Sequence, residues 1–409
     1  MTDKNPLDPD VASDAPIQPG PTSDRGTVLA MGALNVLNHA SFRGSKILVA
    51  LTTAQLGYSP FAIGVIFSLY SVFPLLLALY AGRMTDRHGA LLPMRLGTLG
   101  LLIGLLIPFG AFGLYGFCIS CALCGGSYIF FSISMQNLIG RAGKAESRTQ
   151  RYGTYSLLIG VASLVGPLIT GLAVDHLGNR VAYAVLAVFP LITLLIMSRI
   201  SGSLSAAHGP ASKHERMRAM DLLKDRSLLS VLVAGIVIET GLELFTFYMP
   251  IYGHSLGFSG TQVGVVAAAY ALAAIVIRLG MPTLVRWGNE ELVISRSLAL
   301  AGVFYFVTPL VHSYYLMIAT AFALGLALGC CNPLAMMLAY TRSPPGNSGQ
   351  ALGVRQSFNK TTQVLVPLVF GSVGTALGLA AVFWSTAGLL TAASFFIRRT
   401  VKPASRDPS

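Results

Sequence analysis

Charged side chains are scarce in this sequence. Asp, Glu, Lys and Arg together make up 11% of its 409 residues, whereas 54% of the residues are hydrophobic. An ordinary soluble protein carries roughly 25% charged residues, so this chain has too little polar surface to face water on all sides. The composition therefore excludes a soluble globular protein and predicts an integral membrane protein.

Cysteine is equally rare, and the five cysteines all lie within apolar segments: Cys118, Cys121, Cys124, Cys330 and Cys331. This number and placement do not fit a disulfide framework. The first three have a C-x-x-C-x-x-C spacing that a soft metal could use. No His or acidic residue accompanies them, however, and cysteine inside a helix commonly packs as a small apolar residue. We expect no metal site and no cofactor.

Motifs for ATP hydrolysis and for metal-dependent proteolysis are missing. No G-x-x-x-x-G-K-[ST] loop is present, and residues 214–218 depart from H-E-x-x-H at the last position. Residues 257–260 (Gly-Phe-Ser-Gly) resemble the nucleophile turn of membrane serine proteases, which leaves an intramembrane enzyme as a remote alternative. We expect no enzymatic activity, because residues 57–60 (Gly-Tyr-Ser-Pro) indicate a repeated loop instead.

Long apolar segments take up most of the chain. A transmembrane helix needs about 20 mostly apolar residues, and about twelve segments of that length predict an all-α fold with about twelve transmembrane helices. They lie near 28–53, 61–81, 91–111, 113–139, 153–174, 180–199, 228–252, 261–284, 292–310, 314–340, 356–376 and 378–398. Basic residues cluster in every second gap, as in cytoplasmic loops. We therefore expect a plasma-membrane protein, in bacteria of the inner membrane, with both termini in the cytoplasm.

The surplus of positive charge has the same origin. The 28 Lys and Arg against 16 Asp and Glu give a formal net charge of +12. Because the basic residues lie in loops between membrane segments, we expect no nucleic-acid partner. One long charged connection divides the chain into a tail (1–26), a six-helix half (27–199), a cytoplasmic linker (200–227), a second six-helix half (228–399) and a second tail (400–409).

The two halves share a sequence repeat at a constant offset. Residues 56–59 (Leu-Gly-Tyr-Ser) recur as 256–259 (Leu-Gly-Phe-Ser), an offset of 200 residues (257 − 57). The same offset relates identical residues along most of each half: Gly64 and Gly264, Tyr70 and Tyr270, Gln150 and Gln350, Gly153 and Gly353, Pro167 and Pro367, and Gly171 and Gly371. Two repeated halves of this kind are a transporter architecture.

A loop motif after the second segment resembles the G-x-x-x-D-R-x-G signature of the major facilitator superfamily. It reads Gly82-Arg83-Met84-Thr85-Asp86-Arg87-His88-Gly89. The resemblance implies a cytoplasmic latch between the halves, made by Gly82, Asp86, Arg87 and Gly89, by Arg286 in the second copy, and by Arg355 in the eleventh segment. A position at the membrane surface is the alternative for Arg355. Ala90 and Val285 depart from the family pattern.

The fifth segment resembles the antiporter signature of the same family, a Gly-rich pattern ending in G-P-x-x-G-G. Its members here are Gly153, Gly166, Pro167 and Gly171, while Ala162 and Thr170 replace two glycines. The resemblance implies substrate/proton antiport, and close helix packing is the alternative. The Arg-containing fourth-segment motif of drug exporters is absent, because residues 113–139 contain no Lys or Arg.

Ionisable side chains lie inside two matching segments, where a membrane makes them costly and usually functional. The first segment carries His39, Arg43 and Lys46, and the seventh carries Glu239 and Glu243. The offset matches His39 with Glu239 and Arg43 with Glu243. The resemblance implies that these two segments line a central cavity, so we expect these residues to pair across it. Protonation of a glutamate would then release the halves. A static buried salt bridge is the alternative.

Other polar residues of the segments are candidates for substrate binding: Asn35, Gln136, Asn137, Asn332 and Asn359. Hydrogen bonds between helices would explain them equally well. With the resemblance, the sequence predicts a secondary active transporter that moves a small molecule by alternating access, as proton-coupled efflux (substrate/H+ antiport). Proton-coupled uptake of an organic anion is the alternative, because the first segment is cationic. We expect a monomer whose partners are the substrate, protons and membrane lipid.

Overall fold

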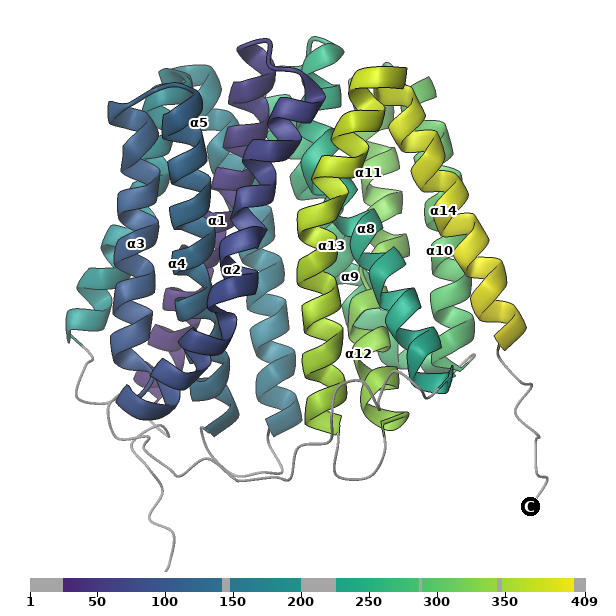
Figure 1. The fold of residues 1–409 in the computed structure, drawn as a ribbon, viewed down its shortest axis with the longest axis horizontal. Coiled ribbons are helices and arrows are strands. Elements are labelled where there is room, and N and C mark those ends of the chain that lie inside the picture. The colour runs from purple at the N-terminus through teal and green to yellow at the C-terminus, as the bar shows by residue number, and fades with distance from the viewer. Residues whose placement is uncertain (1–24, 142–147, 200–225, 287–288, 344–347, 401–409) are drawn as a thin grey trace, which may run out of the picture.

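The computed structural model describes residues 25–141, 148–199, 226–286, 289–343 and 348–400, and nearly all of them are helical (Figure 1). No β-strand occurs within these ranges. The predicted all-α fold is therefore confirmed. Most of the two predicted tails and most of the predicted linker lie outside the described residues.

The helices form two groups that stand side by side, purple to teal and green to yellow in Figure 1. The first half consists of α1 (Arg25–Gln55), α2 (Pro60–His88), α3 (Leu91–Gly110), α4 (Leu114–Arg141) and α5 (Arg148–Arg199). The second consists of α8 (Arg226–Ser255), α9 (Gly260–Arg286), α10 (Glu290–Val307), the 3-10 helix η3 (Thr308–Leu310), α11 (Tyr314–Leu328), α12 (Cys331–Thr341), α13 (Ser348–Leu377) and α14 (Leu379–Thr400).

Twelve membrane crossings can be traced through the described chain. Nine helical stretches are long and apolar enough to cross a membrane by themselves, and one of these runs through α11 and α12. A second one, in α5, makes two crossings, because Gly178 has a left-handed φ of 81° and breaks the helix. The remaining two crossings are α1 and α13, whose polar residues make them less apolar than the others.

Two symmetry-related helix contacts join the halves: α2 packs against α13, and α5 packs against α9. A Cβ atom at Gly64 would overlap the carbonyl oxygen of Pro367. The repeat partner behaves alike, because a Cβ at Gly264 would lie 2.6 Å from the carbonyl oxygen of Pro167. Only glycine permits this approach of two backbones. The offset found in the sequence is therefore also a relation in space.

The halves are joined at the end of the bundle where α2 and α9 begin, which we call the far end. Asp175 of α5 accepts hydrogen bonds from the backbone N–H groups of Gly260 (2.7 Å) and Thr261 (2.8 Å) at the start of α9. At the matching place, the hydroxyl of Thr375 on α13 accepts one from the N–H of Phe61 (3.0 Å) at the start of α2. Each half thus caps a helix of the other.

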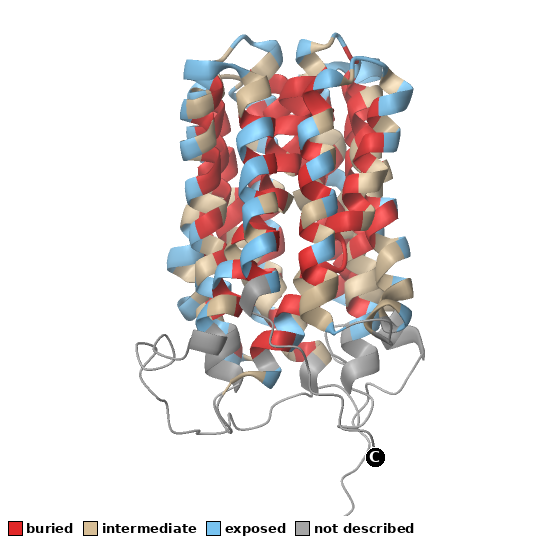
Figure 2. Cartoon of the chain, turned by 90° about the vertical axis from the view of Figure 1, so that its right-hand side faces the viewer, coloured by how far each residue is buried: buried red, intermediate tan, exposed pale blue. Residues whose placement is uncertain are grey.

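The outer surface of the bundle is apolar. Figure 2 shows exposed residues along the outward helix faces and buried residues inside the bundle. Among the outward residues, Leu76 and Tyr115 are 69% and 82% exposed. A continuous apolar surface of this kind is unfavourable in water but fits the acyl chains of a bilayer. The chain is therefore a multi-pass membrane protein.

Candidate functional site

A cavity of about 810 Å³ lies between the two halves. Its wall is drawn from α1, α2, α4 and α5 of the first half and from α8, α9, α12 and α13 of the second. The wall reaches Gln136 and Gly353, close to the loops rich in basic residues. At the far end, the caps at Asp175 and Thr375 hold the halves together. The cavity therefore extends from the middle of the bundle toward the basic loops.

The two polar stripes predicted from the repeat meet at this cavity. Its wall includes His39, Arg43 and Lys46 of α1 and Glu239, Glu243 and Thr246 of α8. Within each helix the spacing of three or four residues places the side chains on one face. Lys46 Nζ lies 2.6 Å from Glu243 Oε1, and both side chains are 5% exposed. This buried ion pair connects the first half with the second.

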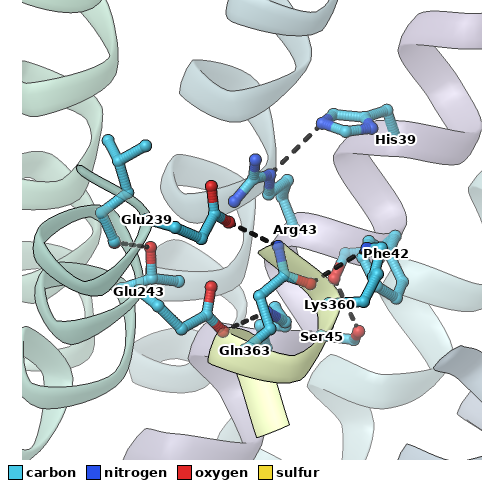
Figure 3. Close-up of polar contacts among 11 residues, drawn as sticks. His39, Phe42, Arg43, Ser45, Glu239, Glu243, Lys360 and Gln363 are labelled. Carbon is cyan, nitrogen blue, oxygen red and sulfur yellow. Dashed lines mark hydrogen bonds and ion pairs between the residues drawn. The ribbon is translucent and has the colours of Figure 1, made fainter. Parts of the chain in front are cut away.

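His39 and Arg43 have other partners than the expected glutamates. Arg43 donates its Nε–H to His39 Nε2 at 3.3 Å (Figure 3). His39 Nδ1 is hydrogen-bonded to the hydroxyl of Tyr128. Because Nε2 accepts a hydrogen bond, the imidazole is neutral and carries its proton on Nδ1. In this conformation Glu243 is paired with Lys46, which lies about one turn further along α1 than Arg43. Two residues at the same depth in the membrane therefore need not have side chains in contact.

Glu239 is held by amides. Its Oε1 accepts a hydrogen bond from Gln363 Nε2 (2.6 Å), and its Oε2 accepts a longer one from Asn332 Nδ2 (3.5 Å). Gln363 Oε1 accepts in turn from Lys360 Nζ (3.0 Å), and Asn332 Oδ1 accepts from Arg355. Figure 3 shows Glu239, Gln363 and Lys360 close together. Lys360 and Arg355 are therefore connected to the Glu239 carboxylate by hydrogen bonds through the side-chain amides of Gln363 and Asn332.

Aromatic rings from both halves form part of the wall. Phe42 and Tyr128 of the first half stack with ring centroids 4.1 Å apart. Phe245 and Tyr270 of the second half stack at the same distance. Cavities of several hundred Å³ that combine aromatic walls with a few polar groups suit organic molecules of drug size.

Two of the five predicted substrate-binding residues line the cavity, namely Gln136 and Asn332. The other three, Asn35, Asn137 and Asn359, are not part of its wall. Asn35 is buried inside the first half, where its amide has no hydrogen-bond partner among the described residues. A polar residue within a membrane segment therefore does not reveal by its type which way it faces.

Arg278, Lys360 and Gln363 are among the polar residues of the wall that were not predicted as site residues. The repeat contains a signal for two of them. The offset of 200 matches Lys360 with Gly160 and Gln363 with Ser163, and both of these residues also line the cavity. Positions that face the cavity in one half therefore also face it in the other half, so the repeat could have predicted Lys360 and Gln363.

The predicted latch residues have different surroundings. Four of them lie at the basic end of α2 or just after it: Gly82, Asp86, Arg87 and Gly89. Asp86 and Arg87 are exposed. Arg355 is buried and donates hydrogen bonds to Asn332, so in this conformation it belongs to the polar network of the cavity. The side chain of Arg286 lies outside the described residues.

The glycines of the antiporter-like motif act mainly in packing. A Cβ at Gly166 would overlap the carbonyl oxygen of Ala40, so Gly166 brings α1 and α5 together within the first half. A Cβ at Gly171 would overlap the carbonyl oxygen of Gly260, which brings α5 and α9 together between the halves. Gly153 has open space around it. The implied antiport remains a prediction.

The cysteines pack as small residues. Cys121, Cys124, Cys330 and Cys331 are buried, and Cys118 is partly exposed. A Cβ at Gly104 of α3 would lie 2.7 Å from Cys124 Sγ, so this thiol fills the space between α3 and α4. Among the described residues, no group of three or more His, Cys, Asp or Glu side chains is arranged to hold a metal ion.

Two six-helix halves around a central polar cavity define the chain as a membrane transporter, and comparison with known proteins identifies the family. The chain matches the family described as Major Facilitator Superfamily over residues 31–292 and 231–409. This protein therefore belongs to the major facilitator superfamily, as the loop motif and the repeat had indicated.

Relatives and solved structures agree with this assignment. Multidrug resistance protein MdtG of Salmonella choleraesuis (strain SC-B67) is 25% identical over 337 residues, which cover 80% of this chain and 82% of that protein. A POT family transporter in complex with 5-aminolevulinic acid has a TM-score of 0.80 at 14% identity, covering 93% of this chain and 98% of that chain. The nucleoside transporter NupG has a TM-score of 0.74 at 13% identity, covering 92% and 100%. At these identities the two structures show the shared fold.

Proposed function

We propose that this transporter is a proton-coupled exporter that moves a small molecule out of the cell in exchange for protons. The observation that carries the proposal is the buried Lys46–Glu243 pair, which joins the halves beside the cavity. An ionisable residue within a membrane is costly and is usually retained for transport. Export is supported by the name of the relatives, which are multidrug resistance proteins.

Proton binding would act on the contact between the halves. A proton on Glu243 removes the charge that holds Lys46, and the cost of an unpaired buried cation then favours a conformation in which Lys46 is hydrated. Glu239 is the second coupling group, because its amide partners can rearrange when the carboxyl group becomes neutral. His39 and Arg43 would keep the opposite wall of the cavity in place.

The orientation of the chain in the membrane follows from its loops. We propose that the end with the basic loops faces the cytoplasm of a bacterial inner membrane, with both termini on that side. The conformation described above would then be open to the cytoplasm and closed toward the outside. The latch residues Asp86 and Arg87 would act at the cytoplasmic end in the opposite conformation. A monomer surrounded by lipid would suffice for this cycle.

Proton coupling can be tested in liposomes that contain the purified protein and a trapped pH-sensitive dye. Lipophilic cations, organic anions, sugars and amino acids are added one at a time, and substrate-driven proton movement is recorded. We expect this movement to vanish in Glu239→Gln and to persist in the control Glu290→Gln, because Glu290 lies at the start of α10 and outside the cavity wall. Unchanged proton movement in Glu239→Gln would remove Glu239 from the mechanism.

A second candidate is uptake of an organic anion together with protons. It is favoured by the excess of cations over carboxylates in the cavity wall. The same assay separates the two candidates. In exchange, protons and substrate move in opposite directions, whereas in cotransport they move in the same direction.

A further inference from the structure

The wall of the cavity carries more positive than negative charge. Its basic residues are Arg43, Lys46, Arg278 and Lys360, and its acidic residues are Glu239 and Glu243. With both carboxyl groups ionised, four cations face two anions, an excess of +2. His39 does not add to this excess, because its Nε2 accepts a hydrogen bond and the ring is neutral.

Three of these cations have no carboxylate partner among the described residues: Arg43, Lys360 and Arg278, which donates its Nε–H to the carbonyl of Gly329 (3.0 Å). Arg43 uses its Nε–H for His39, and its two terminal nitrogens form no ion pair with a described carboxylate. Lys360 donates to the neutral amide of Gln363. Arg43 belongs to the first half and Lys360 to the second. An anion that lies between Arg43 and Lys360 would be attracted by both charges.

The apolar part of the wall fits the same ligand. One stacked aromatic pair from each half faces the cavity, Phe42 with Tyr128 and Phe245 with Tyr270. Flat apolar groups pack well on such rings. A guanidinium binds an oxyanion through two parallel hydrogen bonds, and an ammonium adds a point charge. The wall therefore combines one place for an oxyanion with a surface for a hydrophobic body.

We propose that the cavity takes an aromatic or similarly apolar organic anion, whose oxyanion group binds Arg43 and Lys360 from opposite halves. The inference rests on the proposed transport through this cavity, in either direction, and it names the class of molecule that is carried. A ligand bound to both halves would also respond to the change between the two open conformations. Arg43 and Lys360 belong to different halves, so the ligand would lose one of these contacts when the halves move apart there.

Binding is tested with two permanently charged probes that share one aromatic body, 2-naphthalenesulfonate and 2-naphthyltrimethylammonium. Titration of the purified full chain by isothermal calorimetry gives the affinity of each. We expect the sulfonate to bind more tightly than the ammonium. Arg43→Gln and Lys360→Gln should each weaken sulfonate binding about tenfold or more, as expected for loss of a charge-assisted hydrogen bond. Tighter binding of the ammonium, or binding of neither probe, would overturn the assignment.

The control is Arg95→Gln, which removes the same charge outside the cavity wall, where Arg95 contacts the carbonyl of Met197. We expect this variant to bind the sulfonate as the unaltered protein does. Equal weakening in all three variants would show a general effect of net charge and would contradict the assignment. If Arg43→Gln does not fold, as judged by thermal unfolding, Arg43→Lys and Lys360→Gln carry the test. Flux of the sulfonate into liposomes is measured separately, so binding without flux would contradict the transport proposal alone.

Discussion

The two caps at the far end should set the balance between the inward-facing and outward-facing conformations. Asp175→Ala removes the acceptor of two backbone N–H groups, those of Gly260 and Thr261. Loss of such a cap costs about 0.5–2 kcal/mol, and loss of a negative charge at a helix N-terminus costs a further 0.3–1 kcal/mol or so. Because Asp175 is exposed, we take about 1.4 kcal/mol, which corresponds to a tenfold change in an equilibrium constant.

The whole of this energy acts on the conformational balance, since the contact exists only while the far end is closed. The open far end should therefore become about tenfold more populated relative to the closed one in Asp175→Ala. Thr375→Val should act in the same direction by a smaller amount. Thr375 accepts only one hydrogen bond, from Phe61, because Pro60 before it has no N–H group to offer.

The assay is a distance measurement by pulsed electron paramagnetic resonance in lipid nanodiscs. Spin labels are attached to cysteines introduced at Leu177 and Ser255, which are exposed and lie near the far end of either half, with Cys118 replaced by serine. The matched control is Ser59→Ala. Ser59 caps α2 from within its own half through the N–H of Ala62 (3.3 Å), so its loss affects both conformations equally. An unchanged distance distribution in Asp175→Ala, or an equal change in Ser59→Ala, would refute the reasoning.

Three further predictions follow from the same contacts. Lys46→Gln or Glu243→Gln alone should lower stability by about 3–5 kcal/mol in thermal unfolding, because one buried charge is left unpaired, whereas Lys46→Met with Glu243→Met should restore stability but not coupled transport. Gly64→Val should prevent closure of the far end, since its side chain would overlap Pro367, and should abolish flux, while Gly388→Val, which has open space, should not. Gln363→Leu should weaken the dependence of transport on pH, as Glu239 loses its shorter hydrogen bond; an unaltered pH profile would count against a role for Glu239.

Much of the fold could be predicted from the sequence because a membrane restricts it strongly. Length and apolar composition define a crossing, and the break inside α5 follows from Gly178, since only glycine adopts its left-handed conformation easily. The offset of 200 predicted more than the number of helices. It placed His39, Arg43 and Lys46 opposite Glu239 and Glu243 on the wall of one cavity.

Side-chain partners could not be predicted in the same way. Depth along a helix follows from sequence position, but the contact between Lys46 and Glu243 depends on how α1 and α8 cross and on the side-chain rotamers. Arg355 illustrates the same limit. Its position near the basic end of α13 indicated the latch, whereas its buried guanidinium turns to Asn332 on α12.

The charge of the substrate and the direction of proton movement are linked by this cavity. A proton on Glu239 or Glu243 removes a negative charge, so a bound anion and a bound proton stabilise each other, and by reciprocity each raises the affinity for the other. Glu239 faces the amides of Gln363 and Asn332, and Glu243 faces Lys46. An anion and a proton that bind together are carried together, whereas a cation and a proton compete for the same carboxylates and are exchanged. Inward flux of 2-naphthalenesulfonate that carries protons inward would therefore favour the uptake candidate over the proposed exporter. If sulfonate and protons move in opposite directions, neither glutamate is the coupling group, and the exporter must bind its protons elsewhere.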